Sequence, residues 1–394
     1  MSSDRMVTRR SMLVGGGLAA AGALSGVLAT PAHGGAGRAG AASATAQVPL
    51  WQQAMSRGLV YGSSTTTWQI EPDPDYSQLF ANEAGILFAE DDLLWWRLKP
   101  TPDSPLDFSH ADRIIAYAEN NNQHVCAAHL VWDEGFGEGW TDDDLWGMTE
   151  QQARDTLFPT IQAEVSRYAG RIKSWVVGNE VTDPYDSDAN MLRTNVPWYA
   201  TIGPSYVAEA FHLAQAQDPN ALLLINEFGF ETGAQSFLPI DRRAAYLQAI
   251  DYLLAQGVPV QGVGIQAHLE ANRFASRFDP TAYRAFLADV AARGLPIFIT
   301  EMDVLDDGLR GSGIDPGVAD VYARYLDVAL DEPAVKVVMN FGLSDRYTWL
   351  QEDRPRQDGT PRRPLPYDAN LQPKLAYNAV SNALLNAPVR TPIW

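Results

Sequence analysis

The stretch Ser174-Trp-Val-Val-Gly-Asn-Glu180 is a short apolar run that ends in a carboxylate, and Pro296-Ile-Phe-Ile-Thr-Glu301-Met-Asp303 repeats the pattern. Both runs are typical of parallel strands that are buried on both faces. Because an unpaired carboxylate is costly to bury, a strand that leads directly into glutamate usually holds that residue at a rim or cleft. The two runs therefore predict two glutamates, Glu180 and Glu301, held on rigid elements and facing one cavity.

Apolar runs of this kind recur from Trp51 onward and alternate with amphipathic segments, which is the pattern of parallel strands joined by helices. We expect eight strands, at 58–62, 86–89, 125–132, 174–178, 221–226, 261–266, 296–300 and 335–341. Helices are expected at 111–119, 206–214 and 281–290, among others. The pattern predicts an α/β protein with a single (β/α)8 TIM barrel, whose active site lies at the C-terminal ends of the strands.

A doubly wound open sheet is the alternative fold. It usually has a Gly-rich, phosphate-binding turn after its first strand, and Tyr61-Gly-Ser-Ser-Thr-Thr-Thr67 lacks that pattern. The barrel is therefore favoured.

The composition restricts the classes of ligand. A formal net charge of -19 over 394 residues repels phosphate backbones and anionic lipids, so we expect no nucleic-acid partner and no stable membrane anchoring. Eleven tryptophans and fifteen tyrosines offer aromatic surfaces on which sugar rings can stack. The single cysteine, Cys126, excludes an internal disulfide and is expected to be a buried thiol. We expect a monomer that binds a neutral ligand.

The N-terminus contains Thr8-Arg9-Arg10-Ser11-Met12-Leu13, followed by a Gly/Ala-rich apolar stretch. This is typical of a twin-arginine export signal, because the stretch is too short and too weakly apolar to favour the alternative, a membrane anchor. We expect residues 1–32 to be a signal peptide, 33–47 a flexible linker, and 48–394 the barrel. The protein is then expected to be periplasmic or secreted.

Polar and aromatic residues gather where the expected strands end. These residues are Trp132, Asn179, Glu180, Asn226, Glu227, Gln266, His268, Glu301 and Asp303, with Trp349 beyond the last strand. The spacing of Gln266 and His268 places both side chains on one side of a strand. A metal-dependent hydrolase is disfavoured, because His129, His268 and Asp303 lack the spacing of zinc ligands. We expect no metal and no cofactor.

At these positions the chain strongly resembles glycoside hydrolase family 10, the xylanase family, over about residues 55 to 380. The matching motifs are Trp175-Val-Val-Gly-Asn-Glu180, Ile225-Asn-Glu-Phe228, Gly262-Val-Gly-Ile-Gln-Ala-His-Leu269, Ile299-Thr-Glu-Met-Asp303, Gly342-Leu-Ser-Asp-Arg-Tyr-Thr-Trp349 and Asp368-Ala-Asn-Leu-Gln-Pro-Lys-Leu-Ala-Tyr377.

The resemblance implies a retaining, double-displacement glycosidase. Glu180 would be the acid/base and Glu301 the nucleophile. His268 would donate a hydrogen bond to Glu301 and would itself be held by Asp303. The resemblance also implies substrate contacts from Asn179, which would bind the sugar 2-hydroxyl, and from Gln266, Trp132 and Trp349.

The chain departs from the family pattern on the non-reducing side of the cleft. The family has Glu-Asn-x-Met-Lys-Trp where this chain has Glu90-Asp91-Asp92-Leu93-Leu94-Trp95, and Asp133 replaces a histidine. A tryptophan of the family is Phe341 here. Glu90, Asp91, Trp95, Asp133 and Phe341 are expected to bind substrate. We expect the four altered positions, Asp91, Leu94, Asp133 and Phe341, to line one end of the cleft.

Three functional hypotheses remain at this point. The first is an exported endo-β-1,4-xylanase that acts on polysaccharide or oligosaccharide. The second keeps the retaining mechanism but changes the substrate to another plant β-glycan or a glycosylated plant metabolite, because the departures would alter sugar contacts. The third, a non-catalytic carbohydrate-binding barrel, is disfavoured because a binding protein does not need both glutamates.

Overall fold

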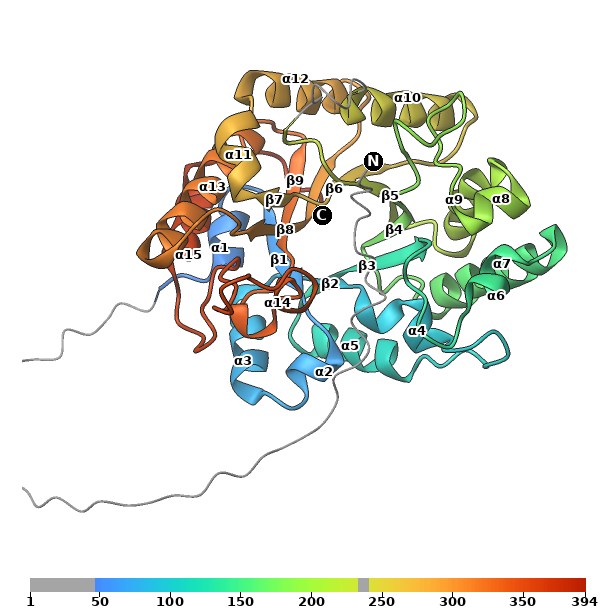
Figure 1. Ribbon diagram of the computed structural model, residues 1–394, viewed down its shortest axis with the longest axis horizontal. Coiled ribbons are helices and arrows are strands. Elements are labelled where there is room, and N and C mark those ends of the chain that lie inside the picture. The colour runs from blue at the N-terminus through green and yellow to red at the C-terminus, as the bar shows by residue number, and fades with distance from the viewer. Residues whose placement is uncertain (1–46, 233–240) are drawn as a thin grey trace, which may run out of the picture.

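The computed structural model describes residues 47–232 and 241–394 (Figure 1). The expected signal peptide, 1–32, lies outside the described residues, as does the expected linker apart from Gln47.

Parallel strands form a closed barrel at the centre of the molecule (Figure 1). In chain order the barrel strands are β1 (Val60–Ser64), β2 (Ile86–Ala89), β3 (His124–Val131), β4 (Ser174–Asn179), β5 (Leu222–Glu227), β6 (Gly262–Ile265), β8 (Ile297–Leu305) and β9 (Val335–Asn340). Each pairs in parallel with the next, and β1 pairs with β9 to close the ring. The (β/α)8 prediction and all eight expected strands are confirmed, and the open-sheet alternative is wrong.

A short additional strand, β7 (His268–Glu270), follows β6 and pairs with the C-terminal half of β8. Its register places His268 opposite Asp303. Two residues before His268, the carbonyl of Gln266 accepts a hydrogen bond of 3.0 Å from the backbone nitrogen of Glu301. The pairing therefore sets Gln266 and His268 beside Glu301 and Asp303 at the rim of the barrel.

Helices surround the barrel, and Figure 1 shows the longer ones on its outer side. They are α1 (Leu50–Met55), α2 (Thr67–Ile70), α3 (Pro74–Glu83), α4 (Trp95–Leu98), α5 (Ser109–Asn120), α6 (Asp142–Trp146), α7 (Glu150–Arg167), α8 (Pro197–Ile202), α9 (Ser205–Gln217), α10 (Arg242–Ala255), α11 (Ala271–Arg277), α12 (Pro280–Ala291), α13 (Ile314–Ala329), α14 (Leu350–Asp353) and α15 (Leu375–Asn386). Short 3-10 helices span Asp91–Leu93, Gly311–Gly313 and Asp345–Tyr347. The three helices expected from the sequence correspond to α5, α9 and α12.

The limits of α12 show how the sequence fixes these helices. Asp279 caps its N-terminus by accepting hydrogen bonds from the backbone nitrogens of Thr281 and Ala282, and proline fills the first helical position. The helix then buries Tyr283, Phe286, Leu287 and Val290 on one face. This spacing of three and four residues is that of an amphipathic helix on the outside of a barrel.

The barrel interior is filled by side chains from alternate strand positions, so it is a packed core rather than a channel. Its members are Ile86, Phe88, Cys126, Ala128, Val176, Leu224, Phe298, Val337, Met339 and Phe341. Burial raises the pKa of the Cys126 thiol to about 12, so the thiol stays protonated and unreactive, in agreement with the prediction of a buried cysteine. Because the interior is apolar, polar groups on the strands gather at the rim.

Candidate active site

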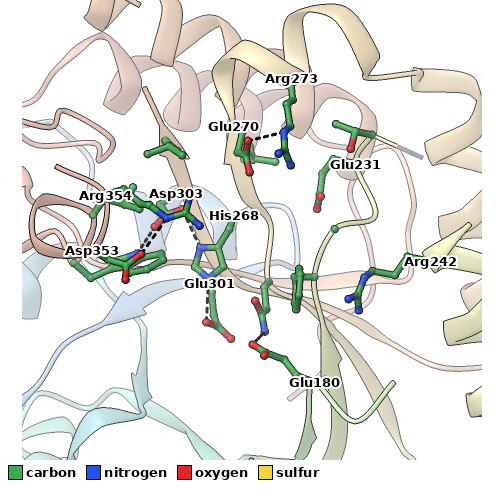
Figure 2. A pocket seen from close by; sticks show the side chains of 18 of the residues that line it. Glu180, Glu231, Arg242, His268, Glu270, Arg273, Glu301, Asp303, Asp353 and Arg354 are labelled. Atoms are coloured by element: carbon green, nitrogen blue, oxygen red, sulfur yellow. Dashed lines mark hydrogen bonds and ion pairs between the residues drawn. The ribbon is translucent and has the colours of Figure 1, made fainter. Parts of the chain in front are cut away.

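Glu180 and Glu301 line the same cavity of about 380 Å³ at the C-terminal rim of the barrel (Figure 2). Glu180 directly follows β4 and has a positive φ of 54°, a strained conformation that turns its side chain away from the strand direction. Glu301 lies within β8 and is only 2% exposed. The predicted convergence of the two glutamates on one cavity is therefore present.

His268 forms a bridge between Glu301 and Asp303. Its Nε2 lies 3.3 Å from Oε2 of Glu301, and its Nδ1 lies 2.9 Å from Oδ1 of Asp303. Burial opposes a charge on the ring, but the two carboxylates outweigh it and raise the pKa of His268 to about 10. His268 is therefore an imidazolium at neutral pH, and both of its nitrogens donate.

Trp349 completes this side of the cavity. Its Nε1 donates to Oδ2 of Asp303 at 2.7 Å, and its ring packs edge to face against His268 with centroids 5.4 Å apart. Asp303 therefore holds two side chains that line the cavity, the imidazolium of His268 and the indole of Trp349. The contacts that the sequence predicted for His268 and Asp303 are all present.

Side-chain amides connect the two glutamates. Gln266 Nε2 donates to Oε1 of Glu180 at 2.9 Å and approaches Oδ1 of Asn179 at 3.3 Å. Asn226 Nδ2 donates to the same oxygen of Asn179 and to Oε1 of Glu301, each at 2.8 Å. One amide network from β4, β5 and the end of β6 thus orients both carboxylates.

The sequence places Asn226 at the end of an expected strand but assigns it no role in the site. It is fully buried, and the hydroxyl of Thr300 donates to its Oδ1 at 2.8 Å, which fixes the orientation of the amide. A Cβ at Gly264 on the neighbouring strand would lie 2.1 Å from that oxygen, so only glycine leaves room for the amide. The signal in the sequence is a polar residue closing the run 221–226, whereas the glycine opposite it follows only from the strand register.

Glu227 is likewise expected at a strand end without an assigned role, and Arg242 is not predicted from the sequence at all. Glu227 is fully buried, accepts from the backbone nitrogen and hydroxyl of Thr182, and pairs with Arg242 at 2.9 Å. Burial raises the pKa of Glu227 to about 7; Arg242 opposes the rise and the charge of Glu180 adds to it. The Arg242 guanidinium covers the ring of Phe228 at 4.2 Å, and both side chains line the cavity.

Trp132 and Asp133 occupy different places despite being neighbours. Trp132 lines the cavity with Glu180, whereas Asp133 is not among the described residues that form its wall. Asp133 pairs instead with Arg193 at 3.1 Å. Burial raises the pKa of Asp133 to about 6, with Arg193 opposing and Glu180 adding to the rise. Asp133 is absent from the described lining of both cavities, so the expectation that it lines the cleft is not confirmed.

A second cavity of about 340 Å³ lies on the other side of Trp349, which lines both cavities. Glu90, Asp91 and Phe341 form part of its wall, as expected from the sequence. Burial raises the pKa of Asp91 to about 7, reinforced by the charges of Glu90 and Asp92 and opposed by Arg97. Two of the four altered positions, Asp91 and Phe341, are therefore together at one end of the cleft.

Leu94 and Trp95 correct the prediction for this end. Leu94 is 5% exposed and Trp95 is 4% exposed, and among the described residues neither lines either cavity. Trp95 stacks on Phe136 with ring centroids 5.0 Å apart and meets Trp140 edge to face. Because α4 turns Trp95 into an aromatic cluster, the expectation that Trp95 contacts substrate is not supported.

Within residues 47–232 and 241–394, no set of three or more histidine, cysteine, aspartate or glutamate side chains is arranged to hold a metal ion. No helix in the same ranges combines the length and the apolar character needed to cross a membrane.

A (β/α)8 barrel with two glutamates facing one rim cavity, joined by amides and an imidazolium, defines a class of protein, the barrel glycoside hydrolases. The particular family follows from comparison with known proteins. The chain belongs to Glycosyl hydrolase family 10, whose sequence profile matches residues 50–383.

Individual relatives are distant. The chain is 27% identical over 328 residues to endo-1,4-beta-xylanase B of Thermotoga neapolitana, covering 81% of this chain and 86% of that protein. It is 29% identical over 323 residues to exoglucanase XynX of Acetivibrio thermocellus, covering 79% of this chain and 27% of that protein. The crystal structure of xylanase 10B from Thermotoga petrophila RKU-1 in complex with xylobiose superposes with a TM-score of 0.73 at 28% identity, covering 86% and 97% of the two chains.

Proposed function

We propose that this glycoside hydrolase is a retaining endo-β-1,4-xylanase. The observation that carries the proposal is the environment of Glu301, which accepts from the amide of Asn226 and from the imidazolium of His268. A carboxylate oriented by two donors, one of them cationic, is suited to attack an anomeric carbon. Glu180 faces the same cavity and is suited to move a proton at the glycosidic oxygen.

In the first step, Glu301 forms a bond to the anomeric carbon while the bond to the leaving sugar breaks. The proton of Glu180 passes to the departing oxygen. In the second step, Glu180 takes a proton from water, the resulting hydroxide bonds to the anomeric carbon, and Glu301 leaves. Two inversions at one carbon give net retention of configuration.

Cleavage within a chain is supported by the arrangement of the two cavities. Both contain Trp349, and only the first contains the two glutamates. A polysaccharide lying across Trp349 would continue past the cleaved bond on both sides. This arrangement favours an endo-acting enzyme over one that binds only a chain end.

A changed glycone preference remains the second candidate, supported by Asp91 and Phe341 in the second cavity. These positions replace an asparagine and a tryptophan of the family pattern. A smaller ring and an acid there alter both the stacking surface and the hydrogen bonds offered to a sugar. Another β-1,4-glycan, with glucose in place of xylose, is the substrate that this alteration would favour.

One set of assays tests both candidates. Purified protein is incubated with xylan, mixed-linkage glucan and cellulose, product lengths are determined, and the anomer first formed is identified by NMR. We expect internal cleavage of xylan with the β-anomer as first product, and no cleavage by Glu301→Ala. Preferred cleavage of a glucan would favour the second candidate, and an α-anomer as first product would exclude the retaining mechanism.

We also propose that the protein is exported by a twin-arginine signal in residues 1–32, on the basis of Arg9 and Arg10 before an apolar stretch. Expression of the full chain in a bacterium with that pathway should give a shortened N-terminus outside the cytoplasm, measured by mass spectrometry. Replacing both arginines with lysine should retain the uncleaved protein inside the cell. Normal export of that variant would exclude this type of signal.

A further inference from the structure

Trp68 is a large aromatic residue with an exposed ring in the wall of the second cavity. It belongs to α2, which follows β1, and is 49% exposed. It lines the second cavity but, among the described residues, not the first, which contains the two glutamates. Trp349 and Phe341, by contrast, lie next to His268, with ring centroids 5.4 and 5.5 Å from it. Trp68 therefore lies at the part of the cleft remote from the catalytic pair.

The ring of Trp68 is supported from behind. Its edge-to-face partner is Tyr347, with centroids 5.7 Å apart and planes at 86°. Tyr347 in turn donates its hydroxyl to Asp73 at 2.8 Å and packs on the ring of Tyr76 at 4.8 Å. The contact on Trp68 is therefore with a fixed ring rather than with a loose side chain.

The backbone beneath Trp68 is also fixed. Asp92, which is 1% exposed, accepts from the backbone nitrogen of Thr67 at 2.7 Å and from its hydroxyl at 2.8 Å. The buried carboxylate therefore fixes the start of the short helix that carries the indole. A pre-positioned aromatic surface loses little conformational entropy when it binds.

Polar side chains border the same cavity. Gln69, Arg346, Gln351 and Glu352 belong to its lining, and they come from α2, the 3-10 helix at Asp345–Tyr347 and α14. Figure 1 shows α2 and α14 on the same side of the barrel mouth. An exposed aromatic face bordered by hydrogen-bonding groups matches a pyranose ring, which offers C–H groups on its faces and hydroxyls at its edge.

We propose that Trp68 forms an additional sugar-binding position at the glycone end of the cleft, where it stacks a pyranose of a β-1,4-linked chain beyond the sugars held near Phe341 and Trp349. This inference rests on the proposed function, because it assumes that a glycan crosses Trp349 into the second cavity. Stacking on Trp68 makes the enzyme sensitive to the length of the sugar chain on the non-reducing side. The ligand of this position is a neutral pyranose, and xylose and glucose chains share the ring face that would stack.

The test measures kcat/KM on aryl β-glycosides with two, three and four sugars on the glycone side, in both the xylose and the glucose series. We expect Trp68→Ala to lower kcat/KM on the longest substrate by about 3- to 10-fold and to leave the disaccharide unchanged. Trp68→Phe should recover part of the loss. Trp146→Ala is the matched control, because Trp146 is 45% exposed and lines neither cavity.

The outcomes separate this inference from the proposed function. Cleavage of the glucose series alone would overturn the xylan assignment, and the length dependence would still decide the role of Trp68. An equal loss on all lengths, or no loss on any, would overturn the sugar-binding role. Calorimetry with xylohexaose and cellohexaose on Glu301→Ala protein, with and without Trp68→Ala, gives the same comparison without turnover. We expect Trp68→Ala to weaken hexaose binding by the same factor, about 3- to 10-fold, by which it lowers kcat/KM on the longest substrate. Affinity for both hexaoses that is unchanged by Trp68→Ala would overturn the proposal.

Discussion

Asn226 Nδ2 lies 2.8 Å from Oε1 of Glu301, although the two residues come from β5 and β8, which are separated by β6. The same nitrogen donates its second proton to Asn179, the neighbour of Glu180 in the chain. One buried amide therefore sets the position of Glu301 relative to the β4 end that carries Glu180. Since a shift of about 1 Å in reacting groups can cost a large factor in rate, this amide is expected to matter for turnover.

Asn226→Ala should lower kcat by about 100-fold, because Glu301 loses a donor and its fixed orientation. Thr300→Val should lower it by about 10-fold or less, since it removes only the hydroxyl that orients the amide. Steady-state kinetics with active-site titration would separate kcat from the fraction of active protein. Asn370→Ala, at an exposed asparagine, is the control. Equal kcat for Asn226→Ala and wild type would contradict a role for the network.

Glu180→Ala and Glu301→Ala should each reduce turnover by several orders of magnitude, but in different ways. Loss of the proton donor should impair poor leaving groups far more than activated aryl glycosides. Azide should rescue Glu180→Ala with retained configuration and Glu301→Ala with inverted configuration, because azide attacks from opposite faces in the two cases. The products are identified by NMR. Identical residual rates on all leaving groups would exclude these roles.

His268 should remain charged up to a pH near 10, the value to which Asp303 and Glu301 raise its pKa. Because this pKa is raised in the folded state, the associated stabilisation is complete below about pH 6.5 and is lost as pH rises through about 10. Asp303→Asn should lower the pKa of His268 and shift the alkaline limb of the kcat profile to lower pH. NMR titration of the imidazole and the pH–rate profile measure the two effects. An unchanged alkaline limb in Asp303→Asn would show that the charge of His268 is not needed.

Asp91→Asn should stabilise the protein at pH 8 and have little effect at pH 4. Burial raises the pKa of Asp91 to about 7, so its stabilising contribution is complete below the unfolded value of about 3.9 and is lost as pH rises through about 7. Asparagine imitates the neutral form at every pH. Thermal unfolding at both pH values measures the difference, with Asp103→Asn at an exposed position as the control. A loss of stability at pH 8 would show that the carboxylate is needed there.

Leu94→Lys should destabilise the protein rather than restore a sugar contact. The family pattern has lysine at this position, but Leu94 is 5% exposed, lines neither cavity, and would lie 3.2 Å from a Cβ at Gly135. A buried ammonium without a partner is costly, whereas Leu94→Met keeps the volume and should be tolerated. The midpoint of thermal unfolding compares the two variants. A Leu94→Lys variant that is as stable as wild type and more active on xylan would restore the expectation that position 94 lines the cleft.

The sequence by itself determined the barrel and the two glutamates. Apolar runs of strand length, such as 174–178 and 296–300, alternate with amphipathic segments, and this local pattern has few packing solutions other than a parallel sheet covered by helices. A carboxylate directly after such a run predicts the strand end, because the apolar interior excludes it. This holds for Glu180, whereas β8 continues past Glu301 to Leu305. Glu180, Glu301, His268 and Asp303 nevertheless line one cavity at the rim, as the local pattern and the family resemblance led us to expect, and their catalytic roles stay predictions.

Only the tertiary structure decided which polar groups touch. Asn226 and Gly264 are neighbours through strand register, and Arg242 reaches Glu227 from a helix, so neither contact follows from sequence spacing. Trp95 is turned inward because the rotation of the single-turn helix α4 is set by the aromatic residues that Trp95 packs against. Trp68 is 49% exposed, and its edge-to-face partner Tyr347 lies 279 positions later in the chain. Contacts between distant segments depend on the closed barrel as a whole, and a local pattern does not contain that information.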